Sequence, residues 1–309
     1  MFTHQVLESV AGPLDQITDE TTGLRLVICR TGAEPVSLAL RNGKGEWEGF
    51  LWRDGQVEKP ASGWGNHATV MGYFVHRLWK QQSIYEGHPI KGGNHGFVRS
   101  HAFPQPEVDL ATGMITYHVD PAEIPADAYP YKVAMRLTYG VSQGSMRMRF
   151  EFENREEHPV ALSFGWHPGF DVGSLESARV ILPAGNYRRE MAPGDFLDGT
   201  VQEIPFTGGE MPFPKKDLPG SFLLDLEGVS DRRFVLEAPA LGHRIECDYS
   251  EAPYLTLWSN GDPFVCIEPC WGLPDHNPPV PFEQKKGIQH IAAGSTISAS
   301  LAVTPTFLG

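Results

Sequence analysis

Long apolar runs are missing from the sequence. No stretch of about 18 consecutive apolar residues occurs, which argues against a membrane-spanning helix. Residues 1–5 contain no basic region followed by an apolar one, so no secretory signal is expected. Disorder is also excluded as the main state, because 17 Phe, 9 Tyr and 7 Trp can build a large core.

Positive charge and cysteine are scarce. The chain has 25 Lys and Arg against 38 Asp and Glu, a net charge of −13. That balance argues against nucleic-acid and anionic-membrane partners, since either needs clustered basic side chains, but a single phosphate pocket built from one or two arginines is compatible with it. Four cysteines in 309 residues do not form a disulfide scaffold, and no Asn-x-Ser/Thr sequon occurs. We therefore expect a cytoplasmic protein.

Turn-forming residues are abundant and spread along the whole chain, with 33 Gly and 26 Pro separating short β-branched and aromatic segments. Residues 145–154 alternate apolar and charged side chains, which is typical of a half-buried strand. A short helix is conceivable over 70–80, and 186–218 is interpreted as a long excursion. Strands are expected over 24–29, 36–40, 47–52, 114–119, 132–139, 145–154, 160–165, 221–226, 233–236, 244–248, 254–258, 264–268 and 296–304. The pattern predicts one all-β domain over residues 1–309, built from large stacked antiparallel sheets.

The first polar-aromatic segment is Gly-Gly-Asn-His-Gly-Phe-Val-Arg at 92–99. Its glycines permit a close approach of the backbone, and His95 and Arg99 supply hydrogen-bond donors. A glycine-rich turn that happens to carry a surface histidine and arginine explains the segment equally well.

The second segment places His167 in Trp-His-Pro-Gly, just beyond the strand expected over 160–165. Histidine titrates near neutrality, so an imidazole held at a strand end could act as a general acid or base. The alternative is a histidine that is hydrogen-bonded to backbone at the edge of a strand.

The third segment is the apolar run 264–268, which ends in Glu268. A carboxyl group there is expected to be partly buried, and burial raises its pKa toward the range of a general base. A structural glutamate that pairs with an arginine or a backbone amide is the alternative.

Neither a metal nor another cofactor is expected. Cys266 and Cys270 are four residues apart without a second cysteine pair, which does not match a structural zinc site. His88, His95 and His101 match no ligand spacing.

These segments resemble the aldose 1-epimerase (galactose mutarotase) family, in particular its LacX-type and hexose-6-phosphate-epimerase-like branches. The likeness rests on His-Gly-Phe-Val-Arg at 95–99, Gly-Trp-His-Pro-Gly-Phe at 165–170 and Phe-Val-Cys-Ile-Glu-Pro at 264–269, together with Arg77 in Gly-Tyr-Phe-Val-His-Arg-Leu. It covers about residues 20–305. A tryptophan that usually follows the first motif in the phosphosugar branch is replaced here by Ser-His-Ala-Phe at 100–103.

The resemblance implies a galactose-mutarotase-like β-supersandwich and metal-free acid–base chemistry on a pyranose sugar. By the same resemblance, Glu268 removes the proton of the C1 hydroxyl and His167 protonates the ring oxygen. His95, Arg77 and Arg99 are expected to bind the substrate. An Asp that contacts sugar hydroxyls is also implied, with Asp217, Asp225 and Asp231 as candidates.

Two other function classes remain open from the sequence. A catalytically inactive sugar-binding or regulatory protein could use the same fold, since a fold does not determine function. A metal-dependent β-sandwich enzyme acting on sugars is the other alternative. The expected partner is a small-molecule sugar, and the chain is expected to be a monomer or a homodimer.

Overall fold

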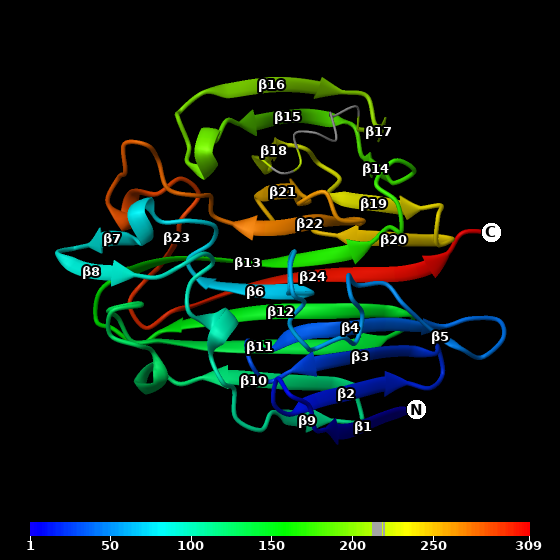
Figure 1. Ribbon diagram of the computed structural model, residues 1–309. Helices are drawn as coiled ribbons and strands as arrows, with labels where there is room; N and C mark the ends of the chain where they lie inside the picture. Colours follow the sequence, from blue (N-terminus) through cyan, green and yellow to red (C-terminus); the bar gives the residue numbers. More distant parts are fainter. Residues whose placement is uncertain (212–217, 219) are drawn as a thin grey trace.

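Antiparallel β-sheets make up almost the whole computed structural model, which describes residues 1–211, 218 and 220–309 (Figure 1). Within these residues the helical segments are short 3-10 turns and there is no α-helix, which confirms the all-β prediction. None of the described helical segments has the length and apolar character needed to cross a bilayer.

A five-stranded meander begins the chain, and it lies at the bottom of Figure 1. Its strands follow one another in sequence, as expected for segments joined by tight turns. They are β1 (Phe2–Leu7), β2 (Leu14–Asp19), β3 (Leu24–Cys29), β4 (Glu34–Arg41) and β5 (Trp47–Gly49).

A nine-stranded sheet runs the length of the molecule in the order β17-β14-β19-β20-β24-β12-β11-β10-β9. Burial in its strand β12 alternates residue by residue, as the sequence predicts for a half-buried strand. The strands are β9 (Glu107–Asp109), β10 (Met114–Val119), β11 (Val133–Ser142), β12 (Ser145–Asn154), β14 (Arg179–Leu182), β17 (Gly209–Glu210), β19 (Arg233–Ala238), β20 (His243–Asp248) and β24 (Thr296–Phe307).

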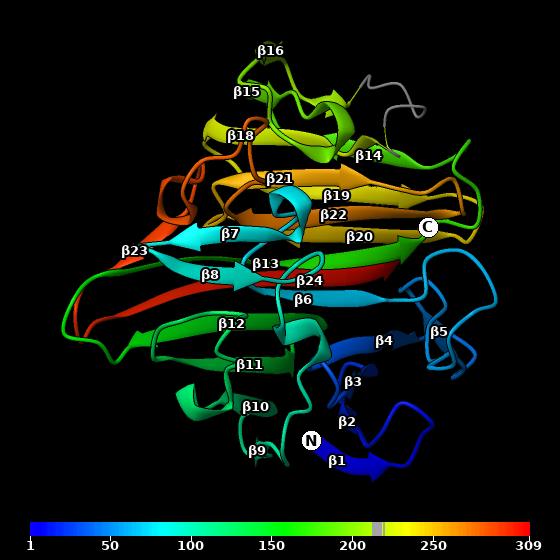
Figure 2. The same cartoon turned by 60° about the vertical axis from the view of Figure 1, so that its left-hand side comes forward.

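An eight-stranded sheet lies against it in the order β16-β15-β18-β21-β22-β13-β23, and β6 also pairs with β13. Figure 2 shows β6, β13, β22 and β21 side by side behind the two-stranded β7–β8 hairpin. The bounds are β6 (Ala68–Tyr73), β7 (Gln82–Tyr85), β8 (His88–Lys91), β13 (Val160–Asp171), β15 (Gly185–Glu190), β16 (Val201–Phe206), β18 (Phe222–Gly228), β21 (Tyr254–Trp258), β22 (Phe264–Trp271) and β23 (Gln289–Ile291).

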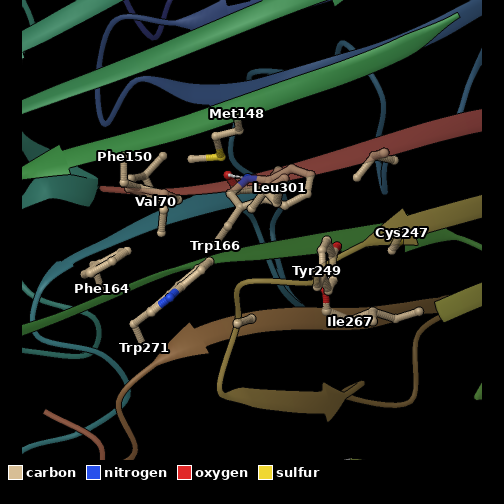
Figure 3. Packing of buried hydrophobic residues seen from close by; sticks show 14 of the residues in the cluster. Val70, Met148, Phe150, Phe164, Trp166, Cys247, Tyr249, Ile267, Trp271 and Leu301 are labelled. Atoms are coloured by element: carbon tan, nitrogen blue, oxygen red, sulfur yellow. Dashed lines mark hydrogen bonds between the residues drawn. The ribbon is translucent and has the colours of Figure 1, made fainter. Parts of the chain in front are cut away.

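Aromatic side chains fill the space between these two sheets (Figure 3). Phe164 of β13 stacks on Trp271 of β22, with 4.9 Å between ring centroids, and packs against Phe150 of β12. Trp166 is fully buried and donates from Nε1 to the carbonyl of Ala68 in β6. Because side chains alternate along a strand, the residues next to these core positions point to the opposite face of the eight-stranded sheet.

Two expectations about local structure are wrong. Residues 70–80 form no helix: they contain most of β6 and the 3-10 turn at Trp79–Gln81. All six residues of β6 are buried, so the segment lacks the polar face of an amphipathic helix. The stretch 186–218 is not a mere excursion either, because its β15 and β16 pair with each other and extend the eight-stranded sheet.

Candidate active site

His167 and Glu268 face each other across two neighbouring strands. The pairing of β13 with β22 puts Gly165 opposite Cys270 and Gly169 opposite Cys266, so the same register puts His167 opposite Glu268. The imidazole Nε2 lies 3.4 Å from the carboxyl Oε1. The exposed fractions are 7% for His167 and 1% for Glu268, so both side chains are held within a packed sheet.

A proline follows each member of this pair. Pro168 and Pro269 lack an N–H group, and the regular β13–β22 pairing is interrupted between Gly165 and Gly169. The carbonyl of Ile267, which is opposite Pro168, accepts a hydrogen bond from Tyr249 Oη at 3.2 Å instead. Prolines are rare in central strands, so two of them beside a buried acid and a buried base mark this place in the sheet as specialised.

The prediction that His167 and Glu268 end their strands is wrong. β13 continues to Asp171 and β22 continues to Trp271, so both residues lie in mid-strand. Proline normally argues against a central strand, so the sequence gives little sign that the strands continue past Pro168 and Pro269. The signal that was available is the matched pair of dipeptides, His-Pro and Glu-Pro, in two apolar segments.

A cavity of about 550 Å³ opens on the face of the sheet that carries this pair. Its floor is a row of side chains from adjacent strands, in which Thr69 of β6 is opposite His167, and Leu223 of β18 follows beyond β21. The walls come from loops. The predicted residues Arg77, His95, Arg99, His167 and Glu268 all line this one cavity, and the lining also includes Lys59, Trp64, Asn66, His76, Asn94, Asp195, Ser221 and Trp258.

His95 is held by the backbone of His76. The His76 N–H donates to His95 Nδ1 at 3.1 Å, and the His95 N–H donates to the His76 carbonyl at 2.8 Å. Since Nδ1 accepts, the proton of a neutral His95 ring is on Nε2. Burial lowers the pKa of His95 well below its usual value, so the ring is neutral and presents a fixed N–H donor.

Burial drives the pKa values of the facing pair in opposite directions. It raises the pKa of Glu268 well above its usual value, and it lowers the pKa of His167 to about 3. Both shifts favour the uncharged forms, because desolvation penalises charge. A single proton on this pair gives either the neutral acid facing a neutral imidazole, which burial favours, or a carboxylate facing an imidazolium.

Two tryptophans enclose the imidazole of His167. Trp64 stacks on it with ring centroids 5.1 Å apart, and Trp258 approaches edge-on at 5.6 Å. Gly169 leaves room for the Trp64 ring, because a Cβ at position 169 would lie 2.4 Å from it. The loop that carries Trp64 is thus packed directly over the acid–base pair.

The rim of the cavity is more basic than its floor. Arg77 Nη1 lies 3.1 Å from Asp195 Oδ2, and both side chains are partly exposed. Arg99 Nη1 donates to the Asn94 carbonyl at 3.4 Å. Lys59 is a third cation in the lining. A substrate at this rim would meet these cations before it reached the buried pair.

Asp195 is the rim carboxylate that the sequence analysis missed. It lies in a turn after Pro193-Gly194, in a segment without a recognisable motif. Of the three aspartates considered, Asp217 lies outside the described residues, and Asp225 and Asp231 pair with Arg188 and Arg233. Within the described part of the chain, Asp225 and Asp231 are absent from the cavity lining.

Comparisons with known proteins identify the family. A family model described as aldose 1-epimerase matches residues 15–304. Protein LacX (chromosomal) of Lactococcus lactis subsp. lactis is 26% identical over 229 residues, which cover 68% of this chain and 75% of that protein.

Solved structures share the fold over nearly the full chain. A galactose mutarotase related enzyme from Lactobacillus acidophilus has a TM-score of 0.79 and 23% identity, covering 98% of this chain and 97% of its own. A galactose mutarotase-like protein from Lactobacillus casei has a TM-score of 0.78 and 23% identity, covering 98% and 100%. The expected galactose-mutarotase-like β-fold is thereby confirmed.

Proposed function

The chain belongs to the aldose 1-epimerase family, and on that premise we propose that it interconverts the α and β anomers of a hexose or hexose phosphate. The observation that carries the proposal is the buried pair, with His167 Nε2 and Glu268 Oε1 3.4 Å apart on the cavity floor. Ring opening of a pyranose needs one proton removed and one supplied at neighbouring oxygens, and this pair offers one group for each transfer.

In the proposed reaction Glu268, as the carboxylate, takes the proton of the C1 hydroxyl, and His167, as the imidazolium, gives a proton to the ring oxygen. The bond between C1 and the ring oxygen breaks while the C1 carbonyl forms. After rotation about the C1–C2 bond, the ring hydroxyl attacks the other face of the carbonyl. His167 then takes back the hydroxyl proton and Glu268 returns its proton to the C1 oxygen, so no net proton is consumed.

The proton needed for this cycle is already shared by the pair. Neutral carboxylic acid with neutral imidazole has the same composition as carboxylate with imidazolium, so a proton shift between Glu268 and His167 prepares the reactive form. A sugar hydroxyl placed between them could also relay that proton. The neutral form favoured by burial thus becomes the charged form without exchange of protons with solvent.

This proton count predicts an unusual pH dependence. We expect kcat/KM to stay constant between the lowered pKa of His167 and the raised pKa of Glu268, because the pair keeps one proton in that range. Activity should fall near pH 3, where His167, with a pKa lowered to about 3, gains a second proton for the pair. It should fall again on the alkaline side, above the raised pKa of Glu268.

The measurement is kcat/KM across pH, with the spontaneous anomerisation rate subtracted and the fold checked by circular dichroism at each pH. A single ionisation near 6.5, the ordinary pKa of histidine, would contradict the shared-proton arrangement.

Substrate binding is proposed to come from the loops around the pair. His95 Nε2–H donates to a sugar oxygen near the reacting centre, because its other ring nitrogen is occupied by the His76 N–H. Arg77, which Asp195 holds in place, orients hydroxyls at the rim. Trp64 and Trp258 offer aromatic faces and edges to the sugar, and sugar C–H groups pack well on such rings.

A substitution of Arg99 distinguishes a phosphorylated from an unphosphorylated sugar substrate. If the sugar carries a phosphate at the rim, Arg99→Gln should raise KM for that sugar at least about tenfold, since hydrogen bonds to charged groups contribute about 1.5–3 kcal/mol. KM for the unphosphorylated sugar should change little. An equal change of KM for both sugars would show that Arg99 does not bind a phosphate group. The proposed 1-epimerase activity would be unaffected by that result.

Saturation-exchange NMR of glucose, galactose and their 6-phosphates tests the proposal as a whole. Anomer exchange above the spontaneous rate is the expected result for at least one of them. Saturable binding of a sugar without faster exchange would instead support the alternative of a catalytically inactive sugar-binding protein.

We further propose that the chain acts as one catalytic domain in the cytoplasm, as a monomer or a homodimer. The cavity is lined by residues from Lys59 to Pro274, so segments far apart in the sequence build one site. All four cysteines are buried and unpaired, which suits a reducing compartment.

A further inference from the structure

Cys266 is a buried nucleophile that the proposed reaction does not use. It precedes Glu268 by two residues in β22, so its side chain points to the same face of the sheet. Its partner in β13 is Gly169, which adds no side chain between the thiol and His167. A ring nitrogen of His167, Cys266 Sγ and a carboxyl oxygen of Glu268 all lie within 4.8 Å of one another.

These three donors are of the kinds that zinc prefers in proteins. Zinc takes imidazole nitrogen, thiolate sulfur and carboxylate oxygen at about 2.0–2.3 Å in tetrahedral geometry, which places the ligand atoms roughly 3.3–3.8 Å apart. The His167–Glu268 separation of 3.4 Å already falls in that range. Cys266 Sγ lies within 4.8 Å of both atoms, so the thiol must come closer to them when zinc binds.

Charge and access also suit a divalent cation here. Zinc binding displaces the protons of the Cys266 thiol and the Glu268 carboxyl group to solvent. The thiolate and carboxylate that result neutralise the two positive charges of Zn²⁺, so the buried complex would carry no net charge, which limits the cost of desolvation. His167 and Glu268 line the cavity, so a water molecule can reach the fourth position of a tetrahedral ion.

We propose that His167, Cys266 and Glu268 form a Zn²⁺ site, and that zinc bound there inhibits the protein by occupying its acid–base pair. The inhibition rests on the proposed epimerase function, whereas the binding does not. Cysteine spacing could not indicate this site, because two ligands are alternate residues of one strand and the third comes from a strand far away in the sequence.

Metal binding is tested first with Co²⁺ as an optical probe on full-length protein freed of metals by a chelator. We expect one Co²⁺ per chain, a thiolate-to-cobalt charge-transfer band and visible bands of tetrahedral intensity, all abolished by one equivalent of Zn²⁺. Cys266→Ser should remove the charge-transfer band and weaken Zn²⁺ binding at least about tenfold in calorimetry. If the serine variant fails to fold, Cys266→Ala is tested in its place and should show the same loss of the band and of zinc affinity.

Cys270→Ser is the matched control, because Cys270 is a buried cysteine two residues after Glu268 in the same strand but outside the donor group. It should keep the band and the zinc affinity. A wild-type protein without the band, or a Cys266→Ser variant with unchanged zinc affinity, would overturn the site.

The inhibition by zinc is tested separately, by the rate of anomer exchange. Zn²⁺ should slow anomer exchange competitively with sugar in the wild type and in Cys270→Ser, and its inhibition constant should rise at least about tenfold in Cys266→Ser. Activation by zinc, or equal inhibition of all three proteins, would overturn the inhibitory role. If no sugar is epimerised at all, the proposed function fails, and the optical measurement still decides whether the metal site exists.

Discussion

Replacing Glu268 with glutamine is expected to lower kcat for anomer interconversion by roughly 10²–10⁴-fold, the usual contribution of one general acid or base. The amide has the shape of the carboxyl group but cannot take the proton of the C1 hydroxyl. It should also be accommodated in the fold, because Glu268 is 1% exposed and its raised pKa shows that the site already favours a neutral group. Sugar binding should persist, so the loss of activity should appear in kcat and not in the affinity for the sugar.

Saturation-exchange NMR gives the rate, calorimetry gives the sugar affinity and thermal melting reports the fold. Glu190→Gln is a matched control, since Glu190 is also buried but pairs with Lys286 at 2.5 Å outside the lining of the cavity. That variant should keep its kcat even if it melts earlier. A Glu268→Gln protein with wild-type kcat would remove Glu268 from the role of base.

His167→Ala is expected to have an effect of similar size on kcat, because it removes the group that we propose protonates the ring oxygen. The substitution leaves a void beneath Trp64 and Trp258, so we also expect a loss of stability of about 1–3 kcal/mol. The void suggests a specific check: free imidazole in the buffer should restore part of the activity by entering the space left by the side chain.

His243→Ala is the control that distinguishes a loss of kcat from a loss of stability when a buried imidazole is removed. His243 is also buried and stacks on Phe50 with ring centroids 4.1 Å apart, but it does not line the cavity. It should lower the melting temperature while leaving kcat unchanged. If His167→Ala loses no more activity than His243→Ala, the imidazole of His167 is not the acid, and the mechanism has to be rebuilt around Glu268 and His95.

Local patterns predicted several strands, most clearly the one whose two faces differ in polarity. The alternation of β12 follows directly from the sequence, because one face of this strand meets the core. The bounds of β3, β10 and β21 also agree with the expected ranges, although most of their residues are buried. β6 gave no such alternation, since all six of its residues are buried.

The sequence predicts which residues form the candidate site, but not how they are arranged in space. His167 and Glu268 stand out by their surroundings, yet their cross-strand pairing depends on the register of β13 and β22, which arises only when the sheet assembles. The interlocked His76 and His95 have left-handed φ angles of 56° and 68°, a conformation that neighbouring residues rather than side-chain preference impose. Asp195 is brought to Arg77 by the tertiary fold alone.

The cavity combines two kinds of scaffold with different tolerance for change. Its reacting groups are fixed in the middle of central strands, where a shift of one residue would turn them toward the aromatic core. Its rim is made of loop residues such as Lys59, Asn94 and Asp195, and loops accept insertions and substitutions far more readily than buried strands do. Remodelling of the rim can therefore change what the cavity binds, while the positions of His167 and Glu268 are inherited with the sheet.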